Sequence, residues 1–508
     1  MVDNITFQKT IIKIKKDLSS LSLDTKRSSK LASKTVVINA TQLWTLKLFH
    51  ILYIIAKYLQ VQKYNVKILI DDGFLEHIDM IKENDEISVS EIKQRSIFAA
   101  KELLSLDVDL IVPYSKFLSK ENISITKKQK DILVKQNSTN IEYSTFRYFG
   151  KDKINSNYEE NSIHNLIIGD ILAKECYKKW TPISFITLAH MNKYSFSSFY
   201  KYLTSKNVSN VSIGLPMCGY KKNGIEIFSK IDIGYVMQKI MTNLIINKSK
   251  KQTINNFFTD RFLYKNTQNI QNIQSMLQKV KSKGKKIVAI FPNIFQDATW
   301  EEYNSCFNSI EEWFIETVKY LKENNYFIII KAHPNELKWN VSKSSVDYIS
   351  DMIDDNFLIL KNNSKVPSYA LFDYIDLVVV YNGTLLMEAM YKDIPVIAGG
   401  NSYILEGIFN NITQTKTMYF SLFEELTVLK QKQINKKDIL FKYIYFDFFC
   451  REVYIKFLNH NLPYPHIDID IVKKILQEDD LSLDLIMCLI DKDKDFDFNK
   501  YTTLFEIN

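Results

Sequence analysis

Two groups of polar residues follow apolar runs in the second half of the chain and could bind a phosphate. The first group follows YFIII and the second follows DLVVVY. Imidazole, lysine and amide groups donate hydrogen bonds to phosphate oxygens, and so do the N–H groups that open a helix. We therefore predict that the two groups bind a nucleotide. They comprise Lys331, His333, Pro334, Asn335 and Glu336, and then Asn382, Gly383, Thr384 and Glu388.

Each group also has a purely structural interpretation. Pro334 stiffens the turn that presents His333, whose imidazole can donate to a phosphate, although a lone turn histidine can equally be satisfied within its turn. In the second group, Gly383 lets the backbone approach a ligand, and Thr384 adds a hydroxyl where the helix LLMEAMY begins. Glu388 lies one helical turn beyond Thr384 on the same face. The alternative here is a helix N-cap followed by a surface glutamate.

The apolar runs predict the elements that position these groups. They are continuous rather than alternating, which is typical of parallel strands buried on both faces. In the first half, TVVINA, a helix over 41–62 and NVKILIDDG form a βαβ unit, followed by strands at DLIVPY, SFITLAH and NVSIGL. The second half has a strand over 286–291 and a helix over 309–324. Because open α/β folds bind ligands at the carboxyl ends of their strands, we expect both polar groups at such an edge.

Composition and charge limit the classes of partner. An apolar fraction of 46% suits a globular protein, and 66 Lys+Arg against 58 Asp+Glu leave a net charge of +8. The lysines are scattered, without an Arg-rich run or an aromatic-basic repeat, so nucleic acid is not favoured. The charge suits anionic small molecules or an anionic membrane face equally well, and a solvated lysine surface explains it most simply.

The sequence gives no sign of export or of a membrane span. Its five cysteines are far apart without CxxC spacing, so neither a disulfide framework nor a zinc site is indicated. The amino terminus lacks the apolar core and cleavage site of a signal peptide. The apolar segment LWTLKLFHILYIIAKYLQV is interrupted by Lys47, His50 and Lys57, which favours a buried helix. We expect a cytoplasmic protein.

Several motifs resemble those of one enzyme family. KAHPNE, followed by YNGTLLMEAMYKDIPVI, is similar to the HP and S/T-rich motifs of bacterial capsule and surface polysaccharide glycosyltransferases of the GT-B type, including Kdo and sialic acid transferases. IFPNIFQDATW resembles the start of their donor domain, and LAHMNKYSFSSFYKYLTSKNVSNVSI resembles an acceptor-domain segment. The resemblance covers residues 35–420 in order of elements. It implies an α/β fold with two Rossmann-like domains facing a cleft, and a helical C-terminal extension.

The resemblance also assigns roles and regions. It implies that His333 contacts the nucleotide phosphate and that Glu388 binds a ribose hydroxyl. Many relatives carry Ser-Thr or Ser-Ser where this chain has Gly383-Thr384, so one expected hydroxyl is missing. The predicted regions are an N-terminal extension (1–34), an acceptor-side Rossmann-like domain (35–245), a connecting region (246–284), a nucleotide-sugar-binding Rossmann-like domain (285–422) and a helical C-terminal extension (423–508).

Asp72, His190, Asp170 and Asp297 are the candidates for the general base that activates an acceptor hydroxyl. Asp71-Asp72-Gly73 resembles the acidic-acidic-Gly motif of bacterial sialyltransferases, whose carboxylate deprotonates the acceptor, although such a turn is also an ordinary strand exit. His190 ends SFITLAH at a carboxyl edge, which is the better position for this role. The other candidates are Asp170, which can also pair on its own helix, and Asp297 in the donor-domain loop.

No metal or cofactor is expected. The DxD matches at 107–109, 468–470 and 491–493 do not follow a buried strand beside the nucleotide turns, so we predict metal-independent catalysis. The expected partners are a nucleotide-sugar, such as a CMP- or UDP-sugar, and a glycan or lipid-linked acceptor. We also expect peripheral contact with the inner membrane face. Two alternatives stay open: a nucleotide-sugar 2-epimerase or polyol-phosphate transferase on the same fold, and a non-catalytic glycan-binding or scaffold protein.

Overall fold

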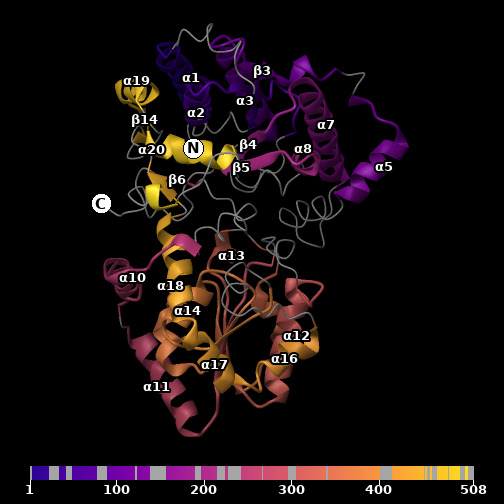
Figure 1. Ribbon diagram of the computed structural model, residues 1–508. Helices are drawn as coiled ribbons and strands as arrows, with labels where there is room; N and C mark the ends of the chain where they lie inside the picture. The colour runs from indigo at the N-terminus through magenta and orange to yellow at the C-terminus, as the bar shows by residue number, and fades with distance from the viewer. Residues whose placement is uncertain are drawn as a thin grey trace. The chain divides into compact units, whose positions relative to one another are not determined.

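The chain forms two compact units in the computed structural model (Figure 1). Unit 1 contains residues 1–240 and 448–508, and unit 2 contains residues 241–447. The structure describes residues 3–21, 34–41, 49–76, 88–119, 123–137, 156–188, 196–213, 224–226, 242–265, 267–295, 305–338, 341, 343–400, 415–450, 452–454, 458–459, 466–478, 480–491 and 498–501.

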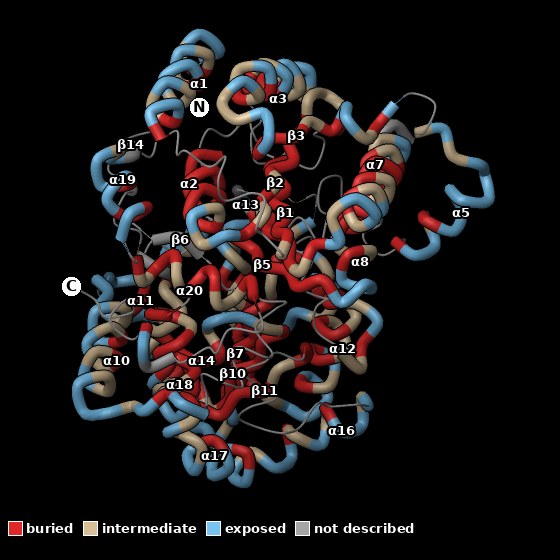
Figure 2. Tube along the Cα trace, turned by 45° about the horizontal axis from the view of Figure 1, so that its top comes forward, coloured by how far each residue is buried: buried red, intermediate tan, exposed pale blue. Residues whose placement is uncertain are grey.

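Unit 1 is built on a parallel five-stranded sheet with the order β3-β2-β1-β4-β5. All six residues of β1 are buried, as the continuous apolar run TVVINA predicts. Figure 2 shows the buried strands of this sheet in red. The strands are β1 (Thr35–Ala40), β2 (Asn65–Ile70), β3 (Ile111–Pro113), β4 (Ser184–Leu188) and β5 (Ser209–Ile213).

The helices of unit 1 connect these strands and cover the sheet. Helix α2 lies between β1 and β2 in the chain and packs on both, which gives the predicted βαβ unit. Helix α7 packs closely on α8, and an added Cβ at Gly169 would lie 2.6 Å from Ser198 Oγ. The helices are α1 (Asn4–Ser19), α2 (Phe49–Val61), α3 (Val89–Leu103), η4 (Tyr114–Lys116), α5 (Lys127–Gln136), α7 (Ser156–Trp180) and α8 (Ser197–Ser205).

Unit 2 has a second parallel five-stranded sheet, with the order β11-β10-β7-β8-β9. Strands β7 and β10 are buried along their whole length. The strands are β7 (Ile287–Phe291), β8 (Phe327–Lys331), β9 (Phe357–Leu360), β10 (Leu377–Val380) and β11 (Val396–Ala398). The helices are α10 (Lys248–Arg261), α11 (Gln268–Ser282), α12 (Ile310–Glu323), α13 (Asn335–Lys338), η5 (Ser345–Met352), η6 (Ser368–Tyr374), α14 (Leu385–Tyr391), α16 (Lys416–Ser421), α17 (Leu426–Asn435) and α18 (Lys437–Tyr445).

The segment 246–284, predicted to be a connecting region, forms two helices of unit 2. Helix α10 packs on α14, where the rings of Phe258 and Tyr391 stack with centroids 4.2 Å apart and the Tyr391 hydroxyl donates to Asn255 Oδ1. Helix α11 packs on η6 and β7. Each helix buries two apolar side chains, Ile254 and Phe258 in α10 and Ile270 and Leu277 in α11. The boundary of the second unit therefore lies earlier in the chain than the sequence predicts.

The segment 423–508, predicted to be one helical extension, is divided between the units. Helices α17 and α18 belong to unit 2, and the chain returns to unit 1 at Phe448. In Figure 1 the yellow α19 and α20 lie beside the indigo elements of unit 1, where both helices pack on α2. The elements after the return are the π-helical turn η7 (Phe446–Cys450), β12 (Glu452–Tyr454), β13 (Leu458–Asn459), β14 (His466–Ile467), α19 (Ile469–Gln477), α20 (Leu481–Ile490) and η8 (Phe498–Tyr501), with β12 pairing with β6 (Gly224–Glu226).

A partly buried ion pair attaches the returning segment to the first sheet. Asp491, which follows α20, accepts hydrogen bonds from Lys34 Nζ at 2.9 and 2.8 Å and from the Tyr64 hydroxyl at 2.7 Å. Lys34 and Tyr64 directly precede β1 and β2 respectively. The last part of the chain is thus an integral part of unit 1.

The expected fold class is confirmed. The chain contains two Rossmann-like α/β units with parallel sheets, the pair of domains that defines the GT-B fold, together with additional helices near its C-terminus. Within the described residues, no helix combines the length and hydrophobicity that a membrane span requires.

Candidate functional site

The strand order of unit 2 reverses between β7 and β10. The chain proceeds from β7 to β8 and β9 on one side, and β10 and β11 lie on the other side. In open α/β sheets the crevice at such a switch point, at the carboxyl ends of the strands, is the usual ligand site. The two predicted phosphate-binding groups follow β8 and β10, the strands on either side of β7. The topology therefore brings both groups to the switch-point edge.

Strand register places the two groups at the same level of this edge. Val380 of β10 pairs with Phe291 of β7, and Ile290 pairs with Ile330, which sets Phe291 level with Lys331. Counting two residues onward from this row gives Asn382, Asn293 and His333. Neighbouring strands are about 4.8 Å apart, so Lys331 and Val380, at the ends of the two outer strands, are separated by roughly 10 Å.

Asn293 is a further candidate that the sequence alone does not indicate. It is half-buried and follows β7, between the two predicted groups. Its amide offers two donors and an acceptor to a ligand at the switch point. The available signal was its place at the end of the apolar run IVAIFPN, but the sequence could not reveal that β7 lies between β8 and β10.

The turn after β8 makes two hydrogen bonds with His333. The N–H of Asn335 donates to His333 Nδ1 at 3.1 Å, and the N–H of Glu336 donates to the His333 carbonyl at 3.0 Å. Since Nδ1 accepts a hydrogen bond here, this contact favours the neutral tautomer with the proton on Nε2. His333 is half-buried, and Pro334 and Asn335 are exposed. In this state the ring can donate a hydrogen bond to an anion through Nε2–H.

Lys331, the last residue of β8, supplies positive charge at the same edge. It is half-buried, and loss of solvation lowers the pKa of its ammonium group from the ordinary value. A poorly solvated cation attracts an anionic ligand more strongly than a fully hydrated one does.

Glu336, expected among the nucleotide-binding residues, is engaged within unit 2. Only 2% of its surface is exposed, and its carboxylate accepts hydrogen bonds from Ser344 Oγ at 2.7 Å, the Ser345 N–H at 3.2 Å and Asn362 Nδ2 at 3.2 Å. These bonds attach the start of η5 to the turn. Glu336 therefore stabilises the turn after β8 and does not face a ligand in this arrangement.

The turn after β10 presents open backbone. Gly383 has a φ of +128°, a conformation that side-chain-bearing residues rarely adopt, and no atom lies within 4 Å of an added Cβ. Its N–H donates to Asn382 Oδ1 at 2.7 Å. Gly383 and Thr384 are exposed, and the Thr384 side chain does not cap α14. A ligand could therefore approach the backbone closely at this turn.

Glu388, predicted to bind a ribose hydroxyl and alternatively to lie on the surface, is buried and paired within unit 2. It is 4% exposed, and its Oε1 accepts hydrogen bonds from Arg261 Nε at 2.9 Å and from a terminal guanidinium nitrogen at 2.7 Å. Arg261 lies in α10, within the predicted connecting region. The ion pair ties α10 to α14, so Glu388 supports the helix that begins at the open turn.

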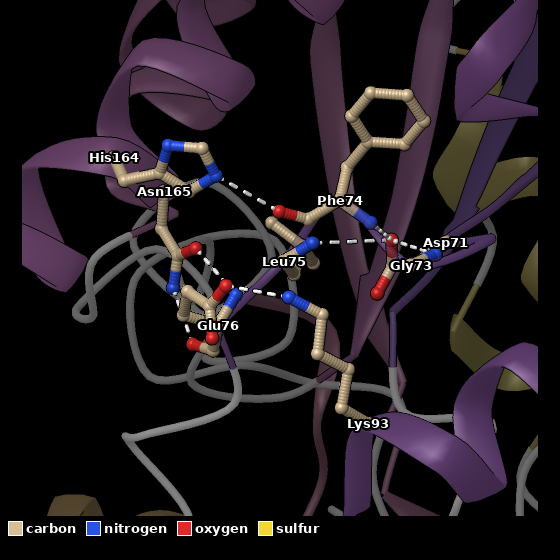
Figure 3. A network of polar contacts seen from close by, with 8 residues as sticks. All are labelled: Asp71, Gly73, Phe74, Leu75, Glu76, Lys93, His164 and Asn165. Carbon is tan, nitrogen blue, oxygen red and sulfur yellow. Dashed lines mark hydrogen bonds and ion pairs between the residues drawn. The ribbon is translucent and has the colours of Figure 1, made fainter. Parts of the chain in front are cut away.

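In unit 1, the two aspartates after β2 have different environments, and Figure 3 shows that of Asp71. Asp71 is fully buried, and its Oδ1 accepts hydrogen bonds from the N–H groups of Gly73, Phe74 and Leu75 at 3.0, 2.8 and 3.2 Å. Asp72 is half-buried and accepts one hydrogen bond from the Ser115 N–H at 3.1 Å. Asp71 thus shapes the turn, and Asp72 is the carboxylate that a ligand could reach.

The remaining candidates for a base have other placements. Asp170 bonds Lys174 Nζ at 2.5 Å, one turn further along α7. It lies about 7.5 Å further along the helix axis than Asn165, which contacts the turn after β2. This distance sets Asp170 back from the carboxyl edge. His190 and Asp297 lie outside the described residues.

The DxD motifs have structural contacts where the structure describes them. Asp107 pairs with the buried Lys57 at 2.6 Å, Asp468 caps α19, and Asp491 holds Lys34 and Tyr64. In the described part of the chain, no group of three or more His, Cys, Asp or Glu side chains could hold a metal ion.

The solved structures that match this chain have low sequence identity and low TM-scores. No protein-family model matches this chain, and no curated protein matches it. Among solved structures, the Thermosulfurimonas dismutans KpsC, a beta Kdo 2,7 transferase, is 11% identical with a TM-score of 0.30, covering 60% of this chain and 88% of its own. The UDP-GlcNAc 2-epimerase from Neisseria meningitidis is 11% identical with a TM-score of 0.24, covering 82% and 100%. A glycosyltransferase from Rickettsia africae is 12% identical with a TM-score of 0.24, covering 81% and 98%.

Proposed function

We propose that this protein is a glycosyltransferase that transfers a sugar from a nucleotide-activated donor to a growing bacterial surface polysaccharide. The observation that carries the proposal is the convergence of Lys331, His333, Asn293 and the open turn at Gly383 on the switch-point edge of unit 2. Such an edge suits a nucleotide, and the residue types suit its phosphates.

In this proposal unit 2 binds the donor. Lys331 and the Nε2–H of His333 contact the phosphate from one side, and the backbone at Gly383 and Thr384 contacts it from the other. Asn293 lies between them. When the bond from sugar to phosphate breaks, negative charge grows on the phosphate, and these donors stabilise it without a metal ion. Pro334 and Asn335 shape the turn that orients His333.

Unit 1 supplies the acceptor side. Asp72 is the general base that removes the proton from the attacking hydroxyl, and a residue in that role contributes about two to four orders of magnitude in rate. His190 remains a second candidate. The acceptor is a glycan or a lipid-linked glycan, which a protein in the cytoplasm would meet at the inner membrane face.

A thermal-shift panel with CMP, CDP, UDP and GDP tests the donor site. At least one nucleotide should raise the melting temperature of the wild-type protein, and Lys331→Met should reduce this increase. Lys319→Met is the matched control, because Lys319 is 66% exposed on α12 and should leave the increase unchanged. If no nucleotide raises the melting temperature, the protein is not a nucleotide-sugar enzyme and the scaffold alternative is favoured.

A second assay separates the enzymatic alternatives. A transferase should need an acceptor for more than slow release of the nucleotide, whereas a 2-epimerase should form free sugar or the epimer of its substrate without one. Product analysis by mass spectrometry and NMR, with and without added glycan acceptor, distinguishes them. Rapid formation of an epimer without acceptor would contradict the transferase proposal.

A further inference from the structure

The turn over residues 71–76 is held by side chains from several elements of unit 1 (Figure 3). The Asp71 carboxylate gathers the N–H groups of Gly73, Phe74 and Leu75 from within the turn. Gly73 has a φ of +115°, and a Cβ there would lie 3.0 Å from Ile97 of α3. The conformation of the turn is therefore defined locally, by a buried carboxylate and a glycine.

Helix α7 fixes the position of this turn through two consecutive residues. Asn165 Oδ1 accepts from the Glu76 N–H at 2.9 Å, and Asn165 Nδ2 donates to the Glu76 carbonyl at 2.7 Å. His164 Nε2 lies 3.0 Å from the Phe74 carbonyl and must donate, because a carbonyl only accepts. Asn165 is 4% exposed, so losing its two bonds would leave buried polar groups of Glu76 without partners.

Contacts with α3 and with the residues after β3 also hold the turn. Lys93 of α3 pairs with Glu76 at 2.6 Å. The Ser115 N–H bonds Asp72, and the neighbouring Tyr114, which is fully buried, donates its hydroxyl to Asn39 Oδ1 at 2.6 Å. Asp72 is therefore the one carboxylate of the turn that is neither buried nor used in an ion pair among the described residues.

We propose that Asn165 is a positioning residue for catalysis, which sets the height and direction of Asp72 at the carboxyl edge of unit 1. The inference rests on the proposed function, in which Asp72 is the general base. Asn165 itself touches no substrate: its side chain acts through the backbone of Glu76. A displacement of about 1 Å in a catalytic group can cost two orders of magnitude in rate. A rigid turn therefore contributes to the rate by keeping the Asp72 carboxylate in place.

The key variant is Asn165→Asp, which keeps the size of the side chain. The new carboxylate still accepts the hydrogen bond from the Glu76 N–H. It cannot donate to the Glu76 carbonyl as the Asn165 amide does, so two acceptor oxygens then face each other. Asn137→Asp is the matched control. Asn137 is also buried in unit 1, donates to the Leu133 carbonyl at 2.9 Å and accepts from Ser197 Oγ at 3.0 Å, yet it does not contact the turn.

Hydrogen exchange and turnover are measured on both variants of the full-length protein. Exchange at the amides of residues 73–76 should become faster in Asn165→Asp and stay unchanged in Asn137→Asp. Release of nucleotide is measured in the presence of a glycan acceptor, with UDP-N-acetylglucosamine, CMP-Kdo or CMP-N-acetylneuraminate as the donor. With the donor that the wild type uses, Asn165→Asp should lower kcat by about tenfold to a hundredfold. The donor KM should not change, because the donor binds unit 2.

A double mutant separates positioning from general damage to the fold. In an Asp72→Asn background, adding Asn165→Asp should change the remaining rate by less than about twofold, because residues that act as one unit are not additive. Equal losses in both backgrounds would overturn the proposal, and so would unchanged exchange at residues 73–76. If Asn165→Asp does not fold, His164→Phe replaces it and removes the bond to Phe74 with little change in volume.

The outcomes distinguish this inference from the proposed function. A wild-type protein that releases nucleotide from none of the three donors, with the glycan acceptor present, contradicts the function, and the exchange data then decide alone whether Asn165 holds the turn. An active wild type with unchanged kcat in Asn165→Asp contradicts the positioning role and leaves the proposed function intact.

Discussion

Replacing Glu388 by Gln tests whether this residue supports the fold of unit 2 or binds the ligand. The glutamate is 4% exposed and accepts two hydrogen bonds from Arg261, at 2.9 and 2.7 Å. Gln keeps the volume and an acceptor oxygen but removes the charge. Hydrogen bonds to charged groups contribute about 1.5–3 kcal/mol each, and neutral ones about half of that.

The expected loss of stability follows from these contacts. The Arg261 side chain is 33% exposed, so water can solvate the cation that loses its partner. We therefore expect the free energy of unfolding of unit 2 to fall by about 1–2 kcal/mol rather than by the larger cost of a fully buried ion pair. For a domain of this size, each kcal/mol lowers the melting temperature by roughly 2–4 °C.

Scanning calorimetry and nucleotide titration are carried out on the same variant. Glu323→Gln is the control, because Glu323 is 61% exposed in a long ion pair of 4.0 Å with Lys319 on α12 and should change neither quantity. Glu388→Gln should lower the melting temperature and leave nucleotide affinity within about threefold, a free-energy change below 1 kcal/mol. An unchanged melting temperature with an affinity loss of tenfold or more would refute the supporting role and restore the ribose contact.

The remaining predictions concern the phosphate site and the packing of each unit. His333→Ala should lower kcat by about a hundredfold or more with an unchanged melting temperature, as for losing one electrostatic stabiliser; an unchanged rate would remove His333 from the site. Turnover should survive EDTA; complete loss that Mg²⁺ or Mn²⁺ restores would contradict metal-independent catalysis. Gly169→Ala should destabilise unit 1 by about 1–3 kcal/mol in denaturant unfolding, because its Cβ would lie 2.6 Å from Ser198 Oγ; equal stability would contradict the close packing of α7 and α8.

The strands and their edges could be predicted from the sequence because their signal is local. A continuous apolar run such as TVVINA identifies a buried parallel strand, and β1 is buried at every position. Polar residues that directly follow such runs must lie at the carboxyl edge. For this reason Lys331, His333 and Gly383 were predicted at an edge, and the structure places them at the switch point.

The structural roles of Glu336 and Glu388 could not be predicted from the sequence, because the residues that they contact depend on the tertiary fold. Glu388 binds Arg261, 127 residues earlier, in a segment with little apolar pattern. Glu336 bonds backbone and side chains at the start of η5. Whether a carboxylate is exposed depends on tertiary packing, which residue type and helical spacing do not determine.

The order of the strands in the sheet and the packing of the C-terminal segment also could not be predicted from local sequence patterns. The crossover that puts β7 between β8 and β10 is a property of the whole sheet, so Asn293 was missed. The return of the chain to unit 1 depends on the buried contacts of Asp491 with Lys34 and Tyr64, more than 400 residues apart in sequence. Helical spacing in this segment predicts helices, but it does not determine which sheet they cover.

Nucleotide affinity of two glycine variants tests the donor site most directly. Gly383 and Gly284 both have positive φ, +128° and +74°, and an added Cβ at either would meet no atom within 4 Å. Each Gly→Ala change therefore strains the backbone without a clash. By isothermal titration with the nucleotide that the thermal-shift panel selects, Gly383→Ala should weaken binding by at least about tenfold, or 1.4 kcal/mol, and Gly284→Ala should bind like the wild type. Wild-type affinity in Gly383→Ala would contradict a phosphate site at the switch point of unit 2.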